Sequence, residues 1–410
     1  MKLKKKDENK YDIKLKEIGK EDPLADYLGP VPYLSGLDSL KVGVHLDWND
    51  SRFMAELQEF KEEFQDETLC PNRSIEWRPF LLDGGLKLNM HRSGTKKYPY
   101  LLKTGDIEIM FSNHKSDAQT PNCRVEIGSM SCWNPGFEQV FNKIMHWIRT
   151  FGGSIRKQKL SEFHPVVDLL GVDFNETGFD DISRWISKAK KYNIHGEYRT
   201  PNYIALGKGA LMMRIYHKTG ELAANAGDAK DVFFQSLWAN HLQALPPKHV
   251  TRIEFQIRRT NIKQLEINTV GDLVKKLNSI WAYCTREWAR FHATKIKEED
   301  RKKKSYKKYN TAFIWEFVCN VRFNEGKIHK VKRKRVRSVN IEALRKQMAG
   351  CATTICGALG LDPGDLDAHI TRSVKELHEQ LEENYNKSLV EYKRKIEAAE
   401  VRANVSALLF

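Results

Sequence analysis

A tyrosine with a cation two residues to either side lies in the segment LMMRIYHKTGE, residues 211–221. Because side chains alternate along a strand, Arg214, Tyr216 and Lys218 would share one face, and His217 would point the other way. Neighbouring positive charges favour the charged form of a phenol, whose free pKa is about 10. The segment predicts a tyrosine nucleophile beside cations able to bind a phosphate. A strand tyrosine without catalytic function is the alternative.

Acidic residues in three other segments could hold a divalent ion. NCRVEIGS places Arg124 and Glu126 on one strand face, and HVTRIEFQIRR repeats the Arg-x-Glu pattern with Glu254. Asp168 and Asp173 interrupt the apolar run FHPVVDLLGVDF, where a carboxylate is costly unless it is paired, hydrogen-bonded or bound to metal. Such oxygen ligands suit Mg²⁺ or Mn²⁺. The alternatives are a ladder of Arg–Glu pairs on a solvated sheet face and aspartates that cap turns.

The elements that must position these residues follow from hydrophobic periodicity. Strands are predicted at 39–48, 86–91, 107–111, 123–127, 163–174, 200–218 (two strands) and 249–259. Helices are predicted at 51–65, 136–151, 180–191, 232–242, 270–293, 339–360 and 368–406. The residues Gly207-Lys208-Gly209 suit a tight hairpin between the two strands of 200–218. The pattern favours an α+β fold, followed by a helical C-terminal region.

Composition and charge narrow the class of partner. The 410 residues carry a formal net charge of +15, which points first to nucleic acid and second to an anionic membrane surface. No run of about 18 apolar residues predicts a membrane span, and the charged N-terminal segment does not resemble a secretory signal. The seven cysteines form no CxxC pair, which favours reduced thiols in a cytosol over a disulfide framework or a zinc site.

The most basic part of the chain, residues 295–337, surrounds the apolar island FIWEFVCNVRF. Its two charge runs are interleaved with aromatic residues, which is typical of nucleic-acid contact. A solvated helix face is the alternative. The predicted DNA-binding residues are Lys302, Lys303, Lys304, Lys307, Lys308, Lys332, Arg333, Lys334, Arg335 and Arg337.

Four segments in order carry a resemblance to a known family: NCRVEIGS, FHPVVDLLGVDF, YIALGKGALMMRIYHKTGE and HVTRIEFQIRR. Together they resemble the replication initiation factors of rolling-circle plasmids and the related relaxases of conjugative elements. The resemblance covers roughly residues 37–265. It implies an HUH-like nuclease core, an antiparallel sheet flanked by helices, in which a tyrosine attacks a phosphodiester and a carboxylate-bound divalent ion polarises the phosphate.

Carried onto this sequence, the resemblance makes Tyr216 the nucleophile, with Arg214 and Lys218 beside it. The acidic positions correspond to Glu126, Asp168, Asp173 and Glu254, as ligands of Mg²⁺ or Mn²⁺. Asp168 and Asp173 are five residues apart, where the family usually spaces them four apart. The extra residue near Gly171 predicts a bulge, or only one aspartate at the site. His217 stands where the family often has Asp or Asn, and its predicted direction favours a structural role.

The sequence therefore predicts a cytosolic bacterial enzyme, a metal-dependent DNA nickase and strand transferase that initiates rolling-circle replication. Three regions are expected: a basic disordered tail at 1–30, a nicking domain at 37–265 and a helical DNA-binding region at 266–410. Origin DNA, single-stranded or cruciform, is the expected partner, and a host helicase and a second copy of the chain are further candidates. The alternatives are a relaxase with the same chemistry, a non-catalytic DNA-binding regulator and an RNA-binding protein.

Overall fold

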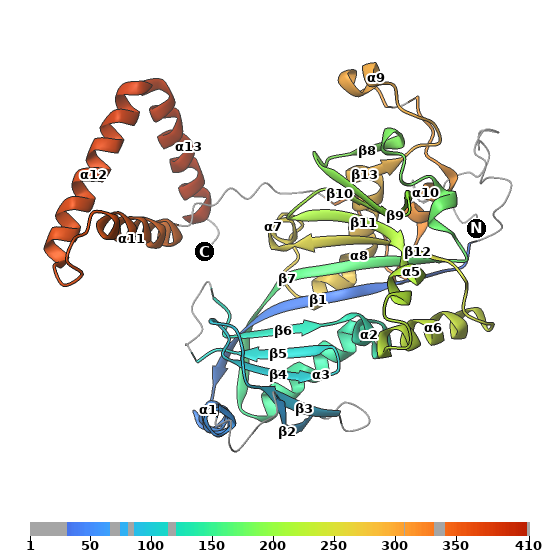
Figure 1. Ribbon diagram of the computed structural model, residues 1–410, viewed down its shortest axis with the longest axis horizontal. Coiled ribbons are helices and arrows are strands. Elements are labelled where there is room, and N and C mark those ends of the chain that lie inside the picture. The colour runs from blue at the N-terminus through green and yellow to red at the C-terminus, as the bar shows by residue number, and fades with distance from the viewer. Residues whose placement is uncertain are drawn as a thin grey trace, which may run out of the picture. The chain divides into compact units, whose positions relative to one another are not determined.

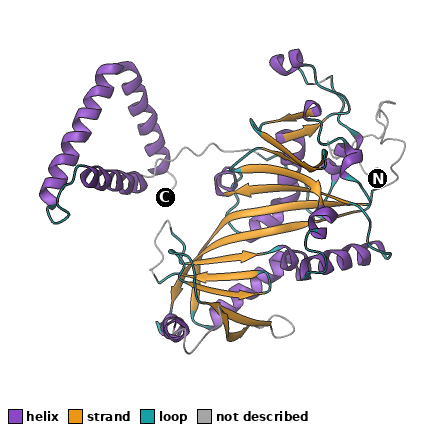
Figure 2. Cartoon of the chain, in the orientation of Figure 1, coloured by secondary structure: helices purple, strands orange, loops and turns teal. Residues whose placement is uncertain are grey.

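The computed structural model describes residues 31–65, 74–80, 86–113, 120–306, 308–331 and 341–407. The chain divides into two compact units, Met1–Lys334 and Arg335–Phe410. The strands of the described residues all lie in the first unit, whereas the described part of the second contains helices (Figure 1, Figure 2). The tail predicted at 1–30 lies outside the described residues.

An antiparallel sheet of eleven strands, in the order β2-β3-β4-β5-β6-β1-β7-β12-β11-β10-β9, forms the body of the first unit. Its strands are β1 (Tyr33–Trp48), β2 (Ser74–Phe80), β3 (Leu86–His91), β4 (Tyr100–Thr104), β5 (Ile107–Phe111), β6 (Cys123–Ile127), β7 (Gly153–Leu170), β9 (Tyr192–Glu197), β10 (Thr200–Leu206), β11 (Leu211–His217) and β12 (Val250–Arg258). β8 (Trp185–Ser187) and β13 (Ala289–Phe291) form a separate pair. The long strands β1 and β7 pair along their length and join the two halves of the sheet.

Helices cover the apolar face of this sheet. α3 (Phe137–Thr150) and α8 (Val270–Tyr283) lie behind it in Figure 1 and bury alternate strand residues such as Val42, Phe163 and Phe255 in one core. The remaining helices of the unit are α1 (Arg52–Gln65), α2 (Ser129–Ser131), α4 (Phe174–Thr177), α5 (Lys218–Ala223), α6 (Ala229–Leu242), α7 (Arg259–Gln264), α9 (Glu298–Lys303) and α10 (Phe313–Asn320). The other face carries polar side chains and packs at one end on a small cluster around Phe234 and Trp238 of α6.

Local sequence explains how two of the elements begin. The turn between β10 and β11 needs Gly207 and Gly209, whose φ angles are +91° and +94°, because other residues rarely adopt this left-handed region. Helix α8 begins with a capping box, in which the Thr269 hydroxyl accepts from the backbone N–H of Asp272 and the Asp272 carboxylate accepts from the N–H of Thr269.

The α+β fold, an antiparallel sheet flanked by helices with helices at the C-terminus, is confirmed. Several elements differ from the prediction. Residues 180–191 are not a helix: a 3-10 turn at Ile182–Arg184 leads into strand β8, and the next strand, β9, was not predicted. Lys218 begins helix α5 instead of ending a strand.

The second unit is helical, as expected for its sequence. It contains α11 (Ile341–Ala358), α12 (Leu366–Lys387) and α13 (Leu389–Ala407), so the single helix predicted at 368–406 is divided at Ser388. None of the helices in the described residues is long and apolar enough to cross a bilayer.

Candidate active site

Tyr216 lies on the polar face of the sheet, in a row that crosses four strands. It pairs in register with Tyr203 of β10 on one side and with Arg252 of β12 on the other, and Arg252 pairs in turn with Asp168 of β7. The Tyr216 hydroxyl donates a hydrogen bond of 3.3 Å to Oε2 of Glu254. The structure therefore brings together the predicted nucleophile and one predicted acidic ligand.

Three side chains around Glu254 form a candidate metal site, which we call the Glu254 cluster: Asp38, His164 and Glu254. One ligand atom from each lies within 4.8 Å of the others. Nδ1 of His164 is 2.8 Å from Oε1 of Glu254. Two carboxylates and one imidazole fit a divalent first-row ion such as Mn²⁺, so the donor set agrees with a divalent metal while adding a histidine that the prediction lacked.

The other ring nitrogen of His164 is fixed by a carboxylate outside this cluster. Nε2 lies 2.9 Å from Oε1 of Glu162, the arrangement that fixes the tautomer of metal-binding histidines. Burial disfavours the imidazolium, but the hydrogen bonds to Glu162 and Glu254 outweigh it and raise the pKa of His164. In turn His164 holds the pKa of Glu162 at about 2.

The electrostatics of Tyr216 differ from the prediction. Burial, and then the negative charge of Glu254, raises its pKa well above the usual value, so the expectation of a phenolate stabilised by its strand neighbours is wrong. Both cations on the strand are also paired with acids. Arg214 forms an ion pair with Glu254, and Lys218 forms one with Glu221.

The two cations still border the tyrosine. Nζ of Lys218 lies 5.9 Å from the centre of the Tyr216 ring, and burial lowers the pKa of Lys218 to about 8. Arg214 is partly exposed, and its Nε is buried without a hydrogen-bond partner among the described residues. A buried N–H without an acceptor is costly, and a phosphate oxygen would satisfy it.

The environment of Asp168 is that of a buried ion pair and not that of a metal ligand. Both it and Arg252 are fully buried, and they form a two-pronged ion pair with distances of 2.6 Å and 2.8 Å. Trp238 also donates to Asp168, at 3.0 Å. Arg252 reaches Asp38 with its remaining nitrogen, at 2.5 Å. The structure thus places Asp168 behind the Glu254 cluster, as an anchor for the arginine that contacts Asp38.

The other two predicted acidic ligands lie away from Tyr216. Glu126 on β6 pairs with Lys41 at 2.9 Å and with Arg124 at 2.5 Å, and three strand spacings separate β6 from β12. Asp173 caps helix α4 and lies close to His217 and His249. Strand β7 ends at Leu170, so Asp168 lies in the strand and Asp173 lies at the start of α4. Because the two aspartates belong to different elements, their spacing of five residues needs no bulge.

The predicted DNA-binding residues divide between described and undescribed parts. Lys302 and Lys303 end helix α9 and are exposed, as is Lys304 after it. Lys308 is exposed and pairs with Asp300 at 2.8 Å. The others, Lys307, Lys332, Arg333, Lys334, Arg335 and Arg337, lie outside the described residues.

Sequence reasoning missed Asp38 and the role of His164. Asp38 falls at a register shift between Leu37 and Ser39 in the pairing of β1 with β7, and such a bulge re-aims a side chain in a way that strict alternation does not predict. For His164 a signal existed, because it interrupts the apolar run FHPVVDLLGVDF in the same way as the aspartates.

Comparisons with known proteins give a structural likeness and no match in sequence. No family model matches the sequence, and no curated protein matches it. Among solved structures, the chain matches a rolling-circle replication initiator protein from Geobacillus stearothermophilus, with a TM-score of 0.39 and 12% identity, over 72% of this chain and 100% of that chain.

Proposed function

We propose that the chain is a metal-dependent DNA nickase of the rolling-circle initiator type, with Tyr216 as its nucleophile. In the reaction, the Tyr216 oxygen attacks a phosphodiester, the bond from phosphorus to the 3′ oxygen breaks, and the chain stays linked to the 5′ phosphate. The released 3′ oxygen takes a proton and becomes the 3′-OH that a polymerase can extend. The reversal of these steps rejoins strands, because the phosphotyrosine retains the energy of the bond.

One observation carries the proposal: the 3.3 Å hydrogen bond from Tyr216 to Glu254, a member of the three-residue cluster that suits a divalent ion. This contact places the tyrosine oxygen directly beside the residues that would hold the ion. When bound, a divalent ion would supply Lewis-acid polarisation of the phosphate. Asp38, His164 and Glu254 would hold it, with Glu162 orienting the histidine.

The surroundings of the cluster favour an anionic substrate. A hollow on the sheet surface, which we call the basic hollow, is lined by Lys41, Gly43, Lys97, Tyr98, Pro121, Arg124, Lys159, Ser161 and Glu162. Burial, and then the nearby charges of Arg259, Lys263, Lys157 and Lys97, lower the pKa of Lys159, which shows how closely the cations are gathered. Such a group attracts a phosphate backbone.

The basic hollow adjoins the proposed active site through a shared residue. Glu162 lines the hollow and also contacts His164 of the Glu254 cluster, at 2.9 Å. A single strand bound along the hollow would therefore lead toward Tyr216. There, Arg214, with its unpartnered Nε, would contact the phosphate to be cleaved.

The test is a covalent-adduct assay with single-stranded oligonucleotides from the neighbourhood of the gene, in the presence of Mn²⁺. We expect a protein–DNA adduct, mapped by mass spectrometry to Tyr216 and lost in Tyr216→Phe. Tyr203→Phe is the matched control, because this ring is 6.3 Å from that of Tyr216 in the same row. An adduct that survives in Tyr216→Phe and disappears in Tyr203→Phe would move the nucleophile to β10.

A non-catalytic DNA-binding protein is the second candidate, and one observation favours it. Burial and the charge of Glu254 raise the pKa of Tyr216, and its neighbouring cations are paired, as for a structural tyrosine. Such a protein and its Tyr216→Phe variant would bind the oligonucleotides with the same affinity. Neither would form a covalent adduct with DNA, whichever divalent ion is present. The initiator and relaxase versions of the nickase share this site chemistry.

A further inference from the structure

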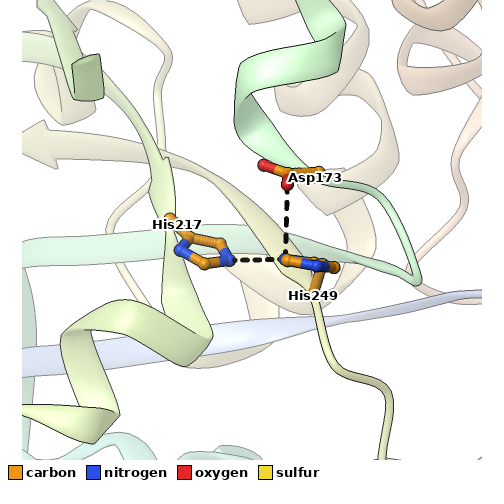
Figure 3. Close-up of side chains that lie close together, drawn as sticks. All are labelled: Asp173, His217 and His249. Carbon is orange, nitrogen blue, oxygen red and sulfur yellow. Dashed lines mark hydrogen bonds and ion pairs between the residues drawn. The ribbon is translucent and has the colours of Figure 1, made fainter. Parts of the chain in front are cut away.

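A second group of metal-type ligands lies next to Tyr216 in sequence, on the other side of strand β11. It consists of Asp173, His217 and His249, and we call it the His249 cluster (Figure 3). One ligand atom from each lies within 4.8 Å of the other two. Since His217 follows Tyr216 directly, its side chain points to the opposite face of the strand. The proposed nicking chemistry uses none of these three residues.

The geometry points to a transition-metal site, and we propose that the His249 cluster binds Zn²⁺ or a similar ion. Nδ1 of His249 lies 3.2 Å from Nε2 of His217 and 3.5 Å from Oδ2 of Asp173. Tetrahedral zinc with bonds of about 2.0–2.1 Å separates neighbouring ligand atoms by roughly 3.3–3.4 Å. The two observed separations bracket this value.

Two of the three ligands, Asp173 and His217, are oriented by their surroundings. Oδ1 of Asp173 accepts from the backbone N–H of Asn175 at the start of α4, which leaves Oδ2 facing His249. A Cβ added to Gly220 would lie 2.9 Å from Nδ1 of His217, so the chain fits closely against this ring. The Thr219 hydroxyl lies 2.9 Å from Nε2 of the same ring and is the group that an ion must displace or recruit.

The donor set distinguishes this site from the Glu254 cluster. Two imidazoles and one carboxylate match three-ligand zinc sites, which leave a fourth position for water. One imidazole and two carboxylates, as in the Glu254 cluster, suit a harder ion such as Mn²⁺. The His249 cluster is also open to ions from solvent, because the side chains of His249 and Asp173 are 29% and 23% exposed.

Bound metal would fasten together three neighbouring segments of the sheet. Asp173 follows β7, His217 ends β11, and His249 directly precedes β12. In the structure these ends already meet, because the N–H of Gly171 donates to the carbonyl of His249 at 2.8 Å. An ion would fix the end of the strand that carries Tyr216, so we assign the site a structural role.

The test is zinc binding by the full chain after removal of metal with a chelator. We expect one tight Zn²⁺ equivalent in competition with a chromophoric chelator, and visible Co²⁺ absorption bands when cobalt replaces it. His249→Ala and Asp173→Asn should lose this equivalent, with at least tenfold weaker binding. The asparagine keeps an acceptor for the cap of α4. His241→Ala, at an exposed histidine of α6, is the control and should bind like the wild type.

Glu254→Gln separates this proposal from the proposed function, because it damages the other cluster and leaves the three zinc ligands in place. It should keep the tight Zn²⁺ equivalent and the rise in melting temperature that zinc causes, both of which His249→Ala should lose. Melting curves of the metal-free variants show whether each one folds. Unchanged zinc affinity in both His249→Ala and Asp173→Asn, or loss of the tight equivalent in Glu254→Gln alone, would overturn the assignment.

Discussion

Replacing Asp168 by asparagine removes the charge that neutralises a fully buried arginine. Arg252 has no exposed surface, and two of its nitrogens bind the two oxygens of Asp168 at 2.6 Å and 2.8 Å. In Asp168→Asn the guanidinium keeps its charge, and one carboxylate remains in contact with it, that of Asp38. Breaking a buried ion pair by removing one partner costs about 3–5 kcal/mol.

The expected loss lies at the low end of that range, about 3 kcal/mol, because asparagine still accepts one hydrogen bond and Asp38 retains its contact with Arg252. Asp38→Asn is the matched control, since it removes a carboxylate from the same arginine. Asp38 is 20% exposed, so water compensates in part, and we expect a loss of about 1 kcal/mol. The order of the two variants should be reversed for metal binding. Asp38→Asn should weaken Mn²⁺ binding, and Asp168→Asn should leave it intact.

The assay is equilibrium urea unfolding followed by tryptophan fluorescence, with Mn²⁺ affinity measured on the same samples. All nine tryptophans lie before residue 335, so the signal reports on the first compact unit alone. A stability loss below about 1 kcal/mol in Asp168→Asn would contradict the structural role given to this residue. Loss of Mn²⁺ binding in Asp168→Asn, with unchanged binding in Asp38→Asn, would make Asp168 the ligand and refute the assignment of the cluster.

Three further changes test the surroundings of the site. Glu162→Gln should weaken Mn²⁺ binding by about 10–100-fold, because it removes the carboxylate that orients His164; titration of the metal-free chain measures this, and unchanged affinity would show that the histidine needs no such support. Lys218→Met should reduce a pH dependence of stability, because burial holds the pKa of Lys218 at about 8 in the fold, against 10.5 for an exposed lysine. The unfolded chain binds more protons between these two pH values, so the wild type gains stability relative to the variant as pH rises through this window. Parallel curves for the two proteins would mean that the lysine is not desolvated. Lys159→Gln should lower the slope of log affinity against log salt for single-stranded DNA by about one unit, and an unchanged slope would place the DNA outside the basic hollow.

The sheet was predictable from the sequence because its strands alternate so regularly. The segments around Val42, Val125 and Phe255 each present apolar residues on one side, and these residues form the core against α3 and α8. The helix predicted at 180–191 is the clearest failure. There, the polar segment becomes a short strand because Trp185 packs its ring against Phe291 of β13, at 4.8 Å between ring centres, and a partner so distant in sequence leaves no local pattern.

The site was predictable in part, for reasons that follow from the same geometry. Alternation along a single strand correctly placed Arg214 and Tyr216 on one face, and the Arg-x-Glu pattern led to Glu254. Alternation within one strand could not show which acid on a neighbouring strand pairs with which cation. The predicted direction of the Tyr216 pKa shift was therefore wrong, because burial and Glu254 raise this pKa. The bulge that brings Asp38 into the cluster left no pattern in the sequence.

The pairing of β1 with β7 has a geometric consequence for any DNA that binds in the basic hollow. Lys41 of the hollow and Asp38 of the Glu254 cluster are three residues apart on β1, and Glu162 and His164 are two apart on β7. At about 3.3 Å per residue, the step from Lys41 to Asp38 along the strand is roughly 10 Å. Two hydrogen-bonded strands do not stretch, so this separation is fixed by the sheet. The DNA phosphate bound in the basic hollow and the phosphodiester cut at Tyr216 would therefore lie a constant distance apart, whatever the base sequence between them.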